Sequence, residues 1–337
     1  KLASRAARKE GGTNLANQCP NNEPQWGQCR FICDLHAEDY DWLVLMDDFS
    51  PLLAGRKELL RCPQSNTLLL TTEPSSVTHY GKAFAAQFAH VITNQDHRAL
   101  PHPHAIRSQT GNVWYYGKSY AQLIDEAPPI KTNVISTLCS AKKQQHTMHA
   151  QRFEFTHKLK KDLPDLEIFG RGVRYIDKKY EALDSYRFHL VVENHFGANV
   201  WSEKLADAFL GYTVPIYCGC PNVYDYFPED SLISINIDDY AGSLQKISKL
   251  INKPGEYERR LAAVIEARRR VTEQYNLASM LSHFIESTTN TCVEIPKKYL
   301  HGRRKIRSRN PAEFARFLSW HTKKILSHNP LSSLYSR

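Results

Sequence analysis

Short apolar runs, most of them followed directly by a polar residue or glycine, recur along most of this 337-residue chain. The runs cover residues 42–46, 67–72, 90–93, 134–139, 166–169, 188–192, 214–217 and 232–235. Segments with helical periodicity lie between several of them, at 82–89, 149–161 and 201–211. Short apolar runs that alternate with helices are typical of buried parallel strands with helices on both faces of the sheet. The sequence therefore predicts an α/β protein.

The strands form two successive groups on either side of Pro128-Pro129, the best candidate for a linker. At ~100–200 residues per domain, the chain length also suits two domains. We predict a loose polar segment at 1–25, Rossmann-like domains at 26–129 and 130–290, and a basic amphipathic tail at 291–337. Ligands bind such sheets beyond the carboxyl ends of the strands, so functional residues are expected directly after the apolar runs.

Composition excludes several classes of protein. Apolar residues make up 42% of the chain and charged residues 23%, which are ordinary globular values. No apolar run approaches the roughly 18 residues of a membrane helix, and residues 1–18 lack the apolar core of a secretory signal. The eight cysteines form no Cys-x-x-Cys pair, and no Asn-x-Ser/Thr sequon occurs. We therefore expect a cytoplasmic protein without a zinc ribbon or a redox motif.

The net charge of +9 is concentrated near the C-terminal end. Residues 296–337 hold eleven Lys and Arg but only one acid, Glu313. After Pro311, a helical stripe is formed by Phe314, Phe317, Leu318, His321 and Ile325. This pattern fits a helix on an anionic membrane surface, and it fits equally a helix that docks on the body of the protein. No nucleic-acid recognition fold accompanies the charge, so we expect no nucleic-acid partner.

One segment places groups suited to an anionic ligand at the start of a helix. Ser202 has the residue type of an N-cap, and Glu203 and Lys204 follow in the first turn. Backbone N–H groups and the helix dipole favour phosphate at such a position. Lys204 and Arg152 can bind a diphosphate, and Glu203 can accept hydrogen bonds from ribose hydroxyls. Together they indicate a site for a nucleoside diphosphate.

Several motifs occur in order between residues 131 and 240. They are Leu138-Cys139-Ser140, the helix with Arg152, Phe169-Gly170-Arg171-Gly172, a Tyr-x-Phe strand that runs into Glu193-Asn194, Ser202-Glu203-Lys204, Ala208-Phe209, Val214-Pro215-Ile216-Tyr217 with Gly219, and Asp238-Asp239-Tyr240. In this order they strongly resemble the donor-binding segment of the alpha-1,3-fucosyltransferases, glycosyltransferase family ten, in a bacterial-type member. Weaker agreement extends over residues 40–100.

The resemblance implies a GT-B architecture, in which two Rossmann-like lobes face each other across a cleft. It implies an inverting transferase that moves L-fucose from GDP-L-fucose to a hydroxyl of a glycan acceptor. Arg152 and Lys204 would hold the diphosphate, and Glu203 and Asn194 would address the ribose or the sugar. The full set of implied donor-binding residues is Arg152, Gly170, Gly172, Glu193, Asn194, Ser202, Glu203 and Lys204.

An inverting transfer needs one base that takes the proton of the acceptor hydroxyl. Glu73 ends a strand of the first domain, is followed at once by Pro74, and matches a glutamate of the family in a comparable place. We therefore predict Glu73 as the catalytic base. Asp47 and Asp48 are the rival, although neighbouring residues of a strand point to opposite faces.

No His/Cys cluster has metal-ligand spacing and the Asp-x-Asp spacing is missing, so no obligatory metal is expected. A divalent cation could still stimulate transfer by screening the diphosphate. The expected partners are a nucleotide sugar and a glycan acceptor, either an oligosaccharide, a lipopolysaccharide or a glycolipid. If the tail lies on a membrane and not on the body of the protein, a further partner is the membrane surface, at the cytoplasmic face of the inner membrane.

Two alternatives stay open at this stage. The same scaffold could use a different nucleotide sugar, because no base-contacting motif stands out in the sequence. The chain could also be a carbohydrate- or membrane-binding adaptor with a decayed donor site. That second alternative is kept open by Val200, which stands where the family commonly has Tyr.

Overall fold

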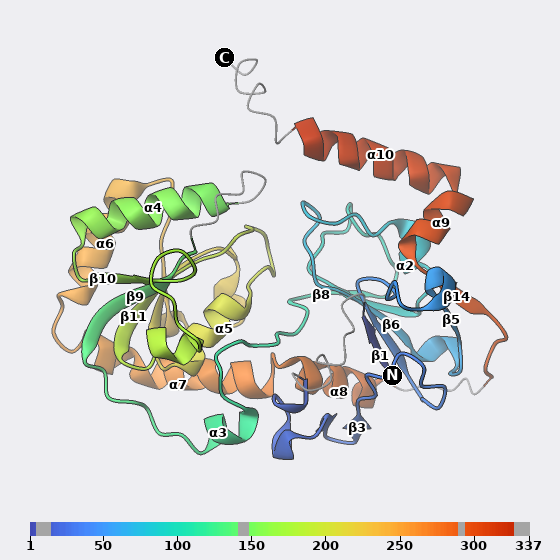
Figure 1. Cartoon of the computed structure of the whole chain (residues 1–337), viewed down its shortest axis with the longest axis horizontal. Coiled ribbons are helices and arrows are strands. Elements are labelled where there is room, and N and C mark those ends of the chain that lie inside the picture. The colour runs from blue at the N-terminus through green and yellow to red at the C-terminus, as the bar shows by residue number, and fades with distance from the viewer. Residues whose placement is uncertain (5–14, 141–147, 289–293, 327–337) are drawn as a thin grey trace. The chain divides into compact units, whose positions relative to one another are not determined.

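The computed structural model of the chain describes residues 1–4, 15–140, 148–288 and 294–326 (Figure 1). The chain divides into two compact units. The N-terminal unit comprises residues 1–16, 24–110 and 281–337, and the C-terminal unit comprises residues 17–23 and 111–280. Each unit is built around its own parallel sheet, which confirms the predicted α/β class with two Rossmann-like lobes.

The described part of the N-terminal unit contains a five-stranded parallel sheet in the order β1-β4-β6-β7-β8. The strands are β1 (Leu2–Ser4), β4 (Leu43–Met46), β6 (Thr67–Thr71), β7 (His90–Thr93) and β8 (Ala105–Arg107). The central strand β6 is buried at every position. Burial on both faces explains its continuous apolar run, because neither face meets water. Polar residues from 72 onward follow its carboxyl end.

Elements from both ends of the chain complete this unit. The helix α2 (Lys82–Ala85) buries Phe84 in the core. The strand β14 (Tyr299–His301) pairs antiparallel with β5 (Lys57–Leu59), and Leu300 joins the same core. The helices α9 (Arg303–Arg309) and α10 (Pro311–Leu326) follow, and a short hairpin is formed by β2 (Gln25–Trp26) and β3 (Cys29–Arg30). The C-terminal region is therefore part of the first unit.

The described part of the C-terminal unit contains a second five-stranded parallel sheet, in the order β10-β9-β11-β12-β13. The strands are β9 (Asn133–Leu138), β10 (Leu166–Phe169), β11 (Tyr186–Val192), β12 (Val214–Cys218) and β13 (Ile233–Ser234). The register aligns Leu190 of β11 with Thr137 of β9 and with Ile216 of β12. The carboxyl ends of β9 and β11 therefore reach the same edge of the sheet.

Helices lie on both sides of this sheet, with α4 and α6 on one side and α7 on the other (Figure 1). The helices of the unit are α3 (Tyr120–Ile124), α4 (His149–Asp162), α5 (Glu203–Leu210), α6 (Tyr240–Ile251) and α7 (Glu256–Glu273), and α8 (Leu277–Ser287) continues the chain into the first unit. The apolar residues of α5, including Leu205 and Phe209, are fully buried. This packing fixes α5 with its N-terminus near the ends of β11 and β12.

The structure divides the chain differently from the sequence prediction. Residues 111–129, predicted to end the first domain, belong to the C-terminal unit because Trp114 and Leu123 pack in its core. Residues 2–4, predicted as part of a loose segment, form β1 and pair with β4. Residues 5–14 of that segment, and residues 291–293 and 327–337 of the predicted tail, lie outside the described residues.

None of the helices in the described part of the chain combines the length and the apolar character that a bilayer crossing requires.

Candidate functional site

A cavity of about 230 Å³ opens in the C-terminal unit at the carboxyl ends of β9 and β11. This is the edge at which parallel α/β sheets bind ligands. The described residues that line it are Thr137, Leu138, Cys139, Ser140, Arg152, Gly170, Lys179, His189, Leu190, Val191, Val192, Glu203 and Lys204. Three of these side chains are basic and one is acidic, so the cavity suits an anionic ligand that also carries hydroxyl groups.

The N-terminus of α5 is held by a buried carboxylate. Ser202 is the N-cap, and its hydroxyl accepts a hydrogen bond from the backbone N–H of Lys204 at 3.3 Å. Glu193 accepts from the backbone N–H of Ser202 at 2.9 Å and from its hydroxyl at 2.6 Å. Glu193 is only 3% exposed and does not line the cavity. These contacts show that Glu193 holds the residue at the start of α5, whereas its direct contact with the donor stays a prediction.

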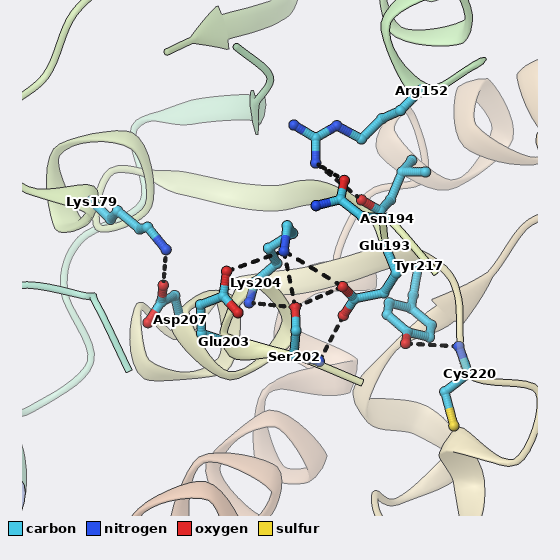
Figure 2. A network of polar contacts seen from close by, with 11 residues as sticks. Arg152, Lys179, Glu193, Asn194, Ser202, Glu203, Lys204, Asp207, Tyr217 and Cys220 are labelled. Carbon is cyan, nitrogen blue, oxygen red and sulfur yellow. Dashed lines mark hydrogen bonds and ion pairs between the residues drawn. The ribbon is translucent and has the colours of Figure 1, made fainter. Parts of the chain in front are cut away.

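Lys204 lies at the centre of a polar network (Figure 2). Its ammonium donates to the hydroxyl of Ser202 and to the carboxylate of Glu203, both at 3.1 Å. It also lies 3.7 Å from the nearer carboxylate oxygen of Glu193. Two carboxylates and a hydroxyl thus surround one ammonium that still reaches the cavity.

The network fixes the charges of its members. Burial raises the pKa of Glu193, although Lys204 and Ser202 oppose this effect. Burial also opposes the ionisation of Glu203, but Lys204 and Lys179 outweigh it and the pKa of Glu203 is lowered. Burial likewise opposes the charge of Lys204, but Glu193 and Glu203 prevail and its pKa is raised. The cavity therefore keeps both the ammonium of Lys204 and the carboxylate of Glu203 charged near neutral pH.

Arg152, on α4, also lines this cavity (Figure 2). Its guanidinium donates to the side-chain oxygen of Asn194 at 3.0 Å and to the carbonyl of Val192 at 3.5 Å. Arg152 is only 8% exposed, so its guanidinium is held in place by these two neutral oxygen atoms. Such a pre-positioned guanidinium is suited to a forked contact with phosphate.

Sequence reasoning missed a third cation, Lys179. Its ammonium lies 2.5 Å from the carboxylate of Asp207 on α5. Asp207 also accepts from the backbone N–H of Tyr115, and burial raises its pKa to about 6. In the sequence, Lys179 is one of two adjacent lysines before a strand, a pattern typical of exposed surface residues. Only the pairing with buried Asp207, 28 residues later, distinguishes it from its neighbour.

The two glycines predicted at the site differ in position. Gly170 lines the cavity with φ of +140°, and a Cβ there would lie 2.9 Å from the carbonyl oxygen of Cys139. A side chain at this position would strain the backbone and disturb the adjacent cavity wall. Gly172 is exposed and does not line the cavity within the described residues.

Glu73 lies in the N-terminal unit, two residues after the end of β6. Partial desolvation of its carboxyl raises its pKa, and nearby Asp47 adds to this shift while Lys324 opposes it. Asp47 itself accepts from the backbone N–H and the hydroxyl of Thr72, at 2.7 and 2.6 Å, and from the hydroxyl of Tyr80. These hydrogen bonds give the carboxylate of Asp47 a structural role, because they tie the end of β4 to Thr72 and Tyr80.

The second rival carboxylate is also engaged. Asp48 is 5% exposed and forms an ion pair with Arg303 at 3.2 Å. It further accepts from the backbone N–H groups of Phe49 and Arg303. Glu73 differs from both aspartates because its side chain is exposed at the end of the strand.

The residues that line the cavity all fall within a segment that is similar to known proteins. Residues 128–292 match the family model Glycosyltransferase family 10 (fucosyltransferase) C-term. An alpha-(1,3)-fucosyltransferase FucT of Helicobacter pylori is 36% identical over 61 residues, which is 18% of this chain and 13% of that protein. An alpha-(1,4)-fucosyltransferase of Arabidopsis thaliana is 31% identical over 83 residues, 25% of this chain and 20% of that protein. The matched segments thus span a fifth or less of these curated relatives.

Among solved structures, a crystal structure of an alpha1,3-fucosyltransferase has a TM-score of 0.46 and 16% sequence identity. That comparison covers 75% of this chain and 80% of the other.

Proposed function

Residues 128–292 belong to glycosyltransferase family 10, the fucosyltransferases, as the sequence motifs predicted; from this membership we propose that the chain transfers L-fucose from GDP-L-fucose to a hydroxyl of a glycan acceptor. The observation that carries the proposal is the cavity at the N-terminus of α5. This cavity is lined by Arg152, Lys179, Lys204 and the ionised Glu203, which all lie inside the segment that matches the family.

In the proposed reaction, the cavity binds the nucleoside diphosphate part of the donor. Lys204 and Arg152 contact the diphosphate, and the backbone N–H groups at the start of α5 add to its stabilisation. Glu203 and Asn194 address hydroxyls of the ribose or the sugar. When the bond between the anomeric carbon and the β-phosphate oxygen breaks, negative charge grows on that oxygen. The two cations offset this charge, which lowers the barrier.

Glu73 is the proposed base. As the acceptor hydroxyl oxygen attacks the anomeric carbon, its proton passes to the carboxylate of Glu73 and GDP leaves with the bonding electron pair. Attack opposite the leaving group inverts the anomeric centre. The raised pKa of Glu73 makes it a stronger base than an ordinary surface glutamate, provided that the pH keeps it ionised.

The protein cations take the place that a metal has in other transferases, so we propose that transfer needs no obligatory metal. A divalent cation bound to the diphosphate would add charge screening and stimulate the reaction. Chelation with EDTA should therefore leave basal transfer in place and remove only the stimulation.

The acceptor and the location are proposed from the chemistry of α10. A glycan on a lipid, such as a lipopolysaccharide or a glycolipid, would bring the enzyme to a membrane surface. α10 offers three apolar side chains that are about half exposed, Phe314, Leu318 and Ile325, next to basic residues. We propose a cytoplasmic enzyme that acts at the inner face of a membrane.

Two measurements test this function. GDP, GDP-fucose, GDP-mannose, UDP-glucose and CMP would be compared by thermal unfolding. A ligand at about 100 times its Kd adds about 2.7 kcal/mol to the stability of the native state, enough for a shift of several degrees. Stabilisation by GDP and GDP-fucose alone supports the proposed donor. A response to UDP or CMP compounds would instead assign another nucleotide sugar, and no response would favour an adaptor.

The second measurement uses the Glu73→Gln variant. Loss of a general base costs about 10²–10⁴-fold in kcat, while the affinity for GDP should stay unchanged because Glu73 does not line the cavity among the described residues. Full transfer activity in this variant would show that Glu73 is not the base.

A further inference from the structure

The helix α10 lies against the segment that carries Glu73. The indole N–H of Trp320 donates to the carbonyl of Ser75 at 2.8 Å, and the ammonium of Lys324 donates to the carbonyl of Val77 at 2.8 Å. Residues 73–79 and α10 belong to the same compact unit. Two residues one turn apart on α10 therefore hold two carbonyls of the single turn at residues 75–77, shortly after Glu73.

Aromatic and ionic contacts extend this interface. The ring of His79 lies 6.0 Å from that of Trp320 and 6.5 Å from that of Phe317, between ring centroids. Glu313, at the start of α10, is 2% exposed and accepts from the backbone N–H of Ala83 at 3.3 Å. A carboxylate with so little exposure is costly unless its bonds are kept, so these contacts fix α10 on the unit.

The other side of residues 73–79 is held by Gln95, which follows β7, and by Tyr80. The side-chain amide of Gln95 donates to the carbonyl of Glu73 at 2.9 Å and to that of Thr78 at 3.0 Å. The backbone N–H of Glu73 donates to the hydroxyl of Tyr80 at 3.3 Å, and that hydroxyl donates to Asp47. Gln95 is 3% exposed, so this side is rigid. The position of residues 75–77 then depends on α10.

We propose that α10 is a clamp that positions the proposed base: Trp320 and Lys324 fix the backbone of residues 75–77 and thereby the orientation of the Glu73 carboxyl. The inference rests on the function proposed above, and it assigns Trp320 and Lys324 as positioning residues for that reaction. It gives the basic C-terminal helix a role in catalysis that does not require a membrane.

The charges around Glu73 support this role. Asp47, at the end of β4, raises its pKa, whereas Lys324 from α10 lowers it. Tyr80, His79 and the arginines of α9 lie near the same segment, and burial lowers the pKa of His79 so that its ring is neutral near pH 7. Lys324 is thus the positive group that favours the ionised base, in addition to holding the backbone beside it.

The experiment compares Trp320→Phe and Lys324→Met with a matched control, Lys323→Met, in the full chain. Phe keeps an aromatic ring but removes the indole donor, so α10 should stay folded, which circular dichroism checks. Lys323 is the neighbouring residue on the same helix and is exposed. Three properties are measured: hydrogen exchange of residues 75–79, kcat and KM with GDP-fucose, and the pH profile of kcat/KM.

Both clamp variants should exchange the amides of residues 75–79 faster than the wild type, since backbone held by fewer contacts opens more often. Trp320→Phe should lower kcat roughly three- to tenfold, as for one lost positioning hydrogen bond, with an unchanged KM for GDP-fucose. In Lys324→Met, the acidic limb of the pH profile should move to higher pH, because the base loses a nearby positive charge. Lys323→Met should match the wild type in all three.

Unchanged exchange in both variants would overturn the clamp whatever the activity is. Faster exchange with a wild-type kcat and acidic limb would also overturn it, because α10 would then only support the fold. Absence of fucosyl transfer in the wild type would contradict the proposed function itself and the catalytic role with it. In that case, faster exchange in the two variants would still show that α10 holds residues 75–77, and only the proposed reaction would be wrong.

Discussion

Lys204 shows how a single residue serves both the fold and the proposed ligand. Its side chain is 24% exposed, and its charge is compensated by Glu203 and Glu193 before any ligand is bound. A partly buried ammonium without such partners would lose its proton or destabilise the fold. Two carboxylates keep it charged, while its position on the cavity wall leaves it accessible to a diphosphate.

Replacement of this charge should weaken binding of the nucleotide. In Lys204→Met, the affinity for GDP should fall about 10- to 100-fold, because a hydrogen bond to a charged group contributes about 1.5–3 kcal/mol. Isothermal titration calorimetry with GDP measures the change. Lys178→Met is the matched control, since Lys178 is a lysine of the same unit that is exposed and does not line the cavity. Equal affinities in the two variants would remove Lys204 from the site.

At the scale of the element, the N-terminus of α5 is the feature that organises the site. Ser202 satisfies a backbone N–H of the helix and also donates to buried Glu193. In Ser202→Ala, both bonds are lost, and the free energy of unfolding should fall by about 1–2 kcal/mol. Urea denaturation measures this loss. Ser319→Ala, at an exposed position inside α10, is the control and should not be destabilised. Equal stability of the two variants would contradict the role of Ser202 as the cap.

The strand β11 carries a second element-scale prediction. His189 is 3% exposed and lies 2.7 Å from the hydroxyl of Ser136, and burial lowers its pKa to about 3, with Lys179 and Lys131 adding to the shift. Below about pH 6.5, the unfolded chain binds a proton that the folded chain does not bind until about pH 3. Stability should therefore fall as the pH drops through this range, by at most about 1.4 kcal/mol per pH unit from this group.

Urea unfolding of the wild type and of His189→Asn between pH 7 and pH 4.5 tests this prediction. The variant should lose stability less steeply as the pH is lowered. His36→Asn, which replaces an exposed histidine, should keep the steep dependence of the wild type. The same slope in all three proteins would mean that His189 is not the responsible group.

The elements near the donor cavity could be predicted from the sequence because their signals are local. The buried runs that became β9, β11 and β12 are continuous apolar segments, and Ser202 stands directly before a helical pattern. Lys179 could not be found in this way, because its partner Asp207 is far along the chain. The contacts of Glu193 were also hidden, since the sequence does not show that its carboxylate bonds the N-cap residue Ser202, nine residues later.

The organisation of the whole molecule was the hardest part to predict. The chain enters the C-terminal unit before Pro128 because Trp114 and Leu123 are buried there, although residues 111–129 carry no strong strand or helix pattern. The return of residues 281–337 to the N-terminal unit depends on distant partners, such as Leu59 for Tyr299 and Asp48 for Arg303. Such pairings leave no periodicity in the sequence.

The positive net charge of the chain and the exposed face of α10 together predict binding to an anionic surface. Phe317, Trp320 and Lys324 contact other parts of the N-terminal unit, whereas Phe314, Leu318 and Ile325 are 49%, 45% and 55% exposed. The helix therefore has one face for the unit and one apolar face beside basic residues. An apolar helix face with adjacent positive charge binds anionic lipid surfaces, and this attraction weakens with salt.

The chain should therefore co-sediment with vesicles that contain phosphatidylglycerol and not with pure phosphatidylcholine vesicles, and added salt should release it. The double variant Phe314→Ser/Leu318→Ser should lose this binding but keep kcat on a soluble acceptor, because these side chains face away from the segment of Glu73. Trp320→Phe should show the reverse, with normal vesicle binding and a lower kcat. If the double serine variant binds vesicles like the wild type, the exposed face of α10 does not bind the membrane. The contacts of α10 would then support the clamp alone.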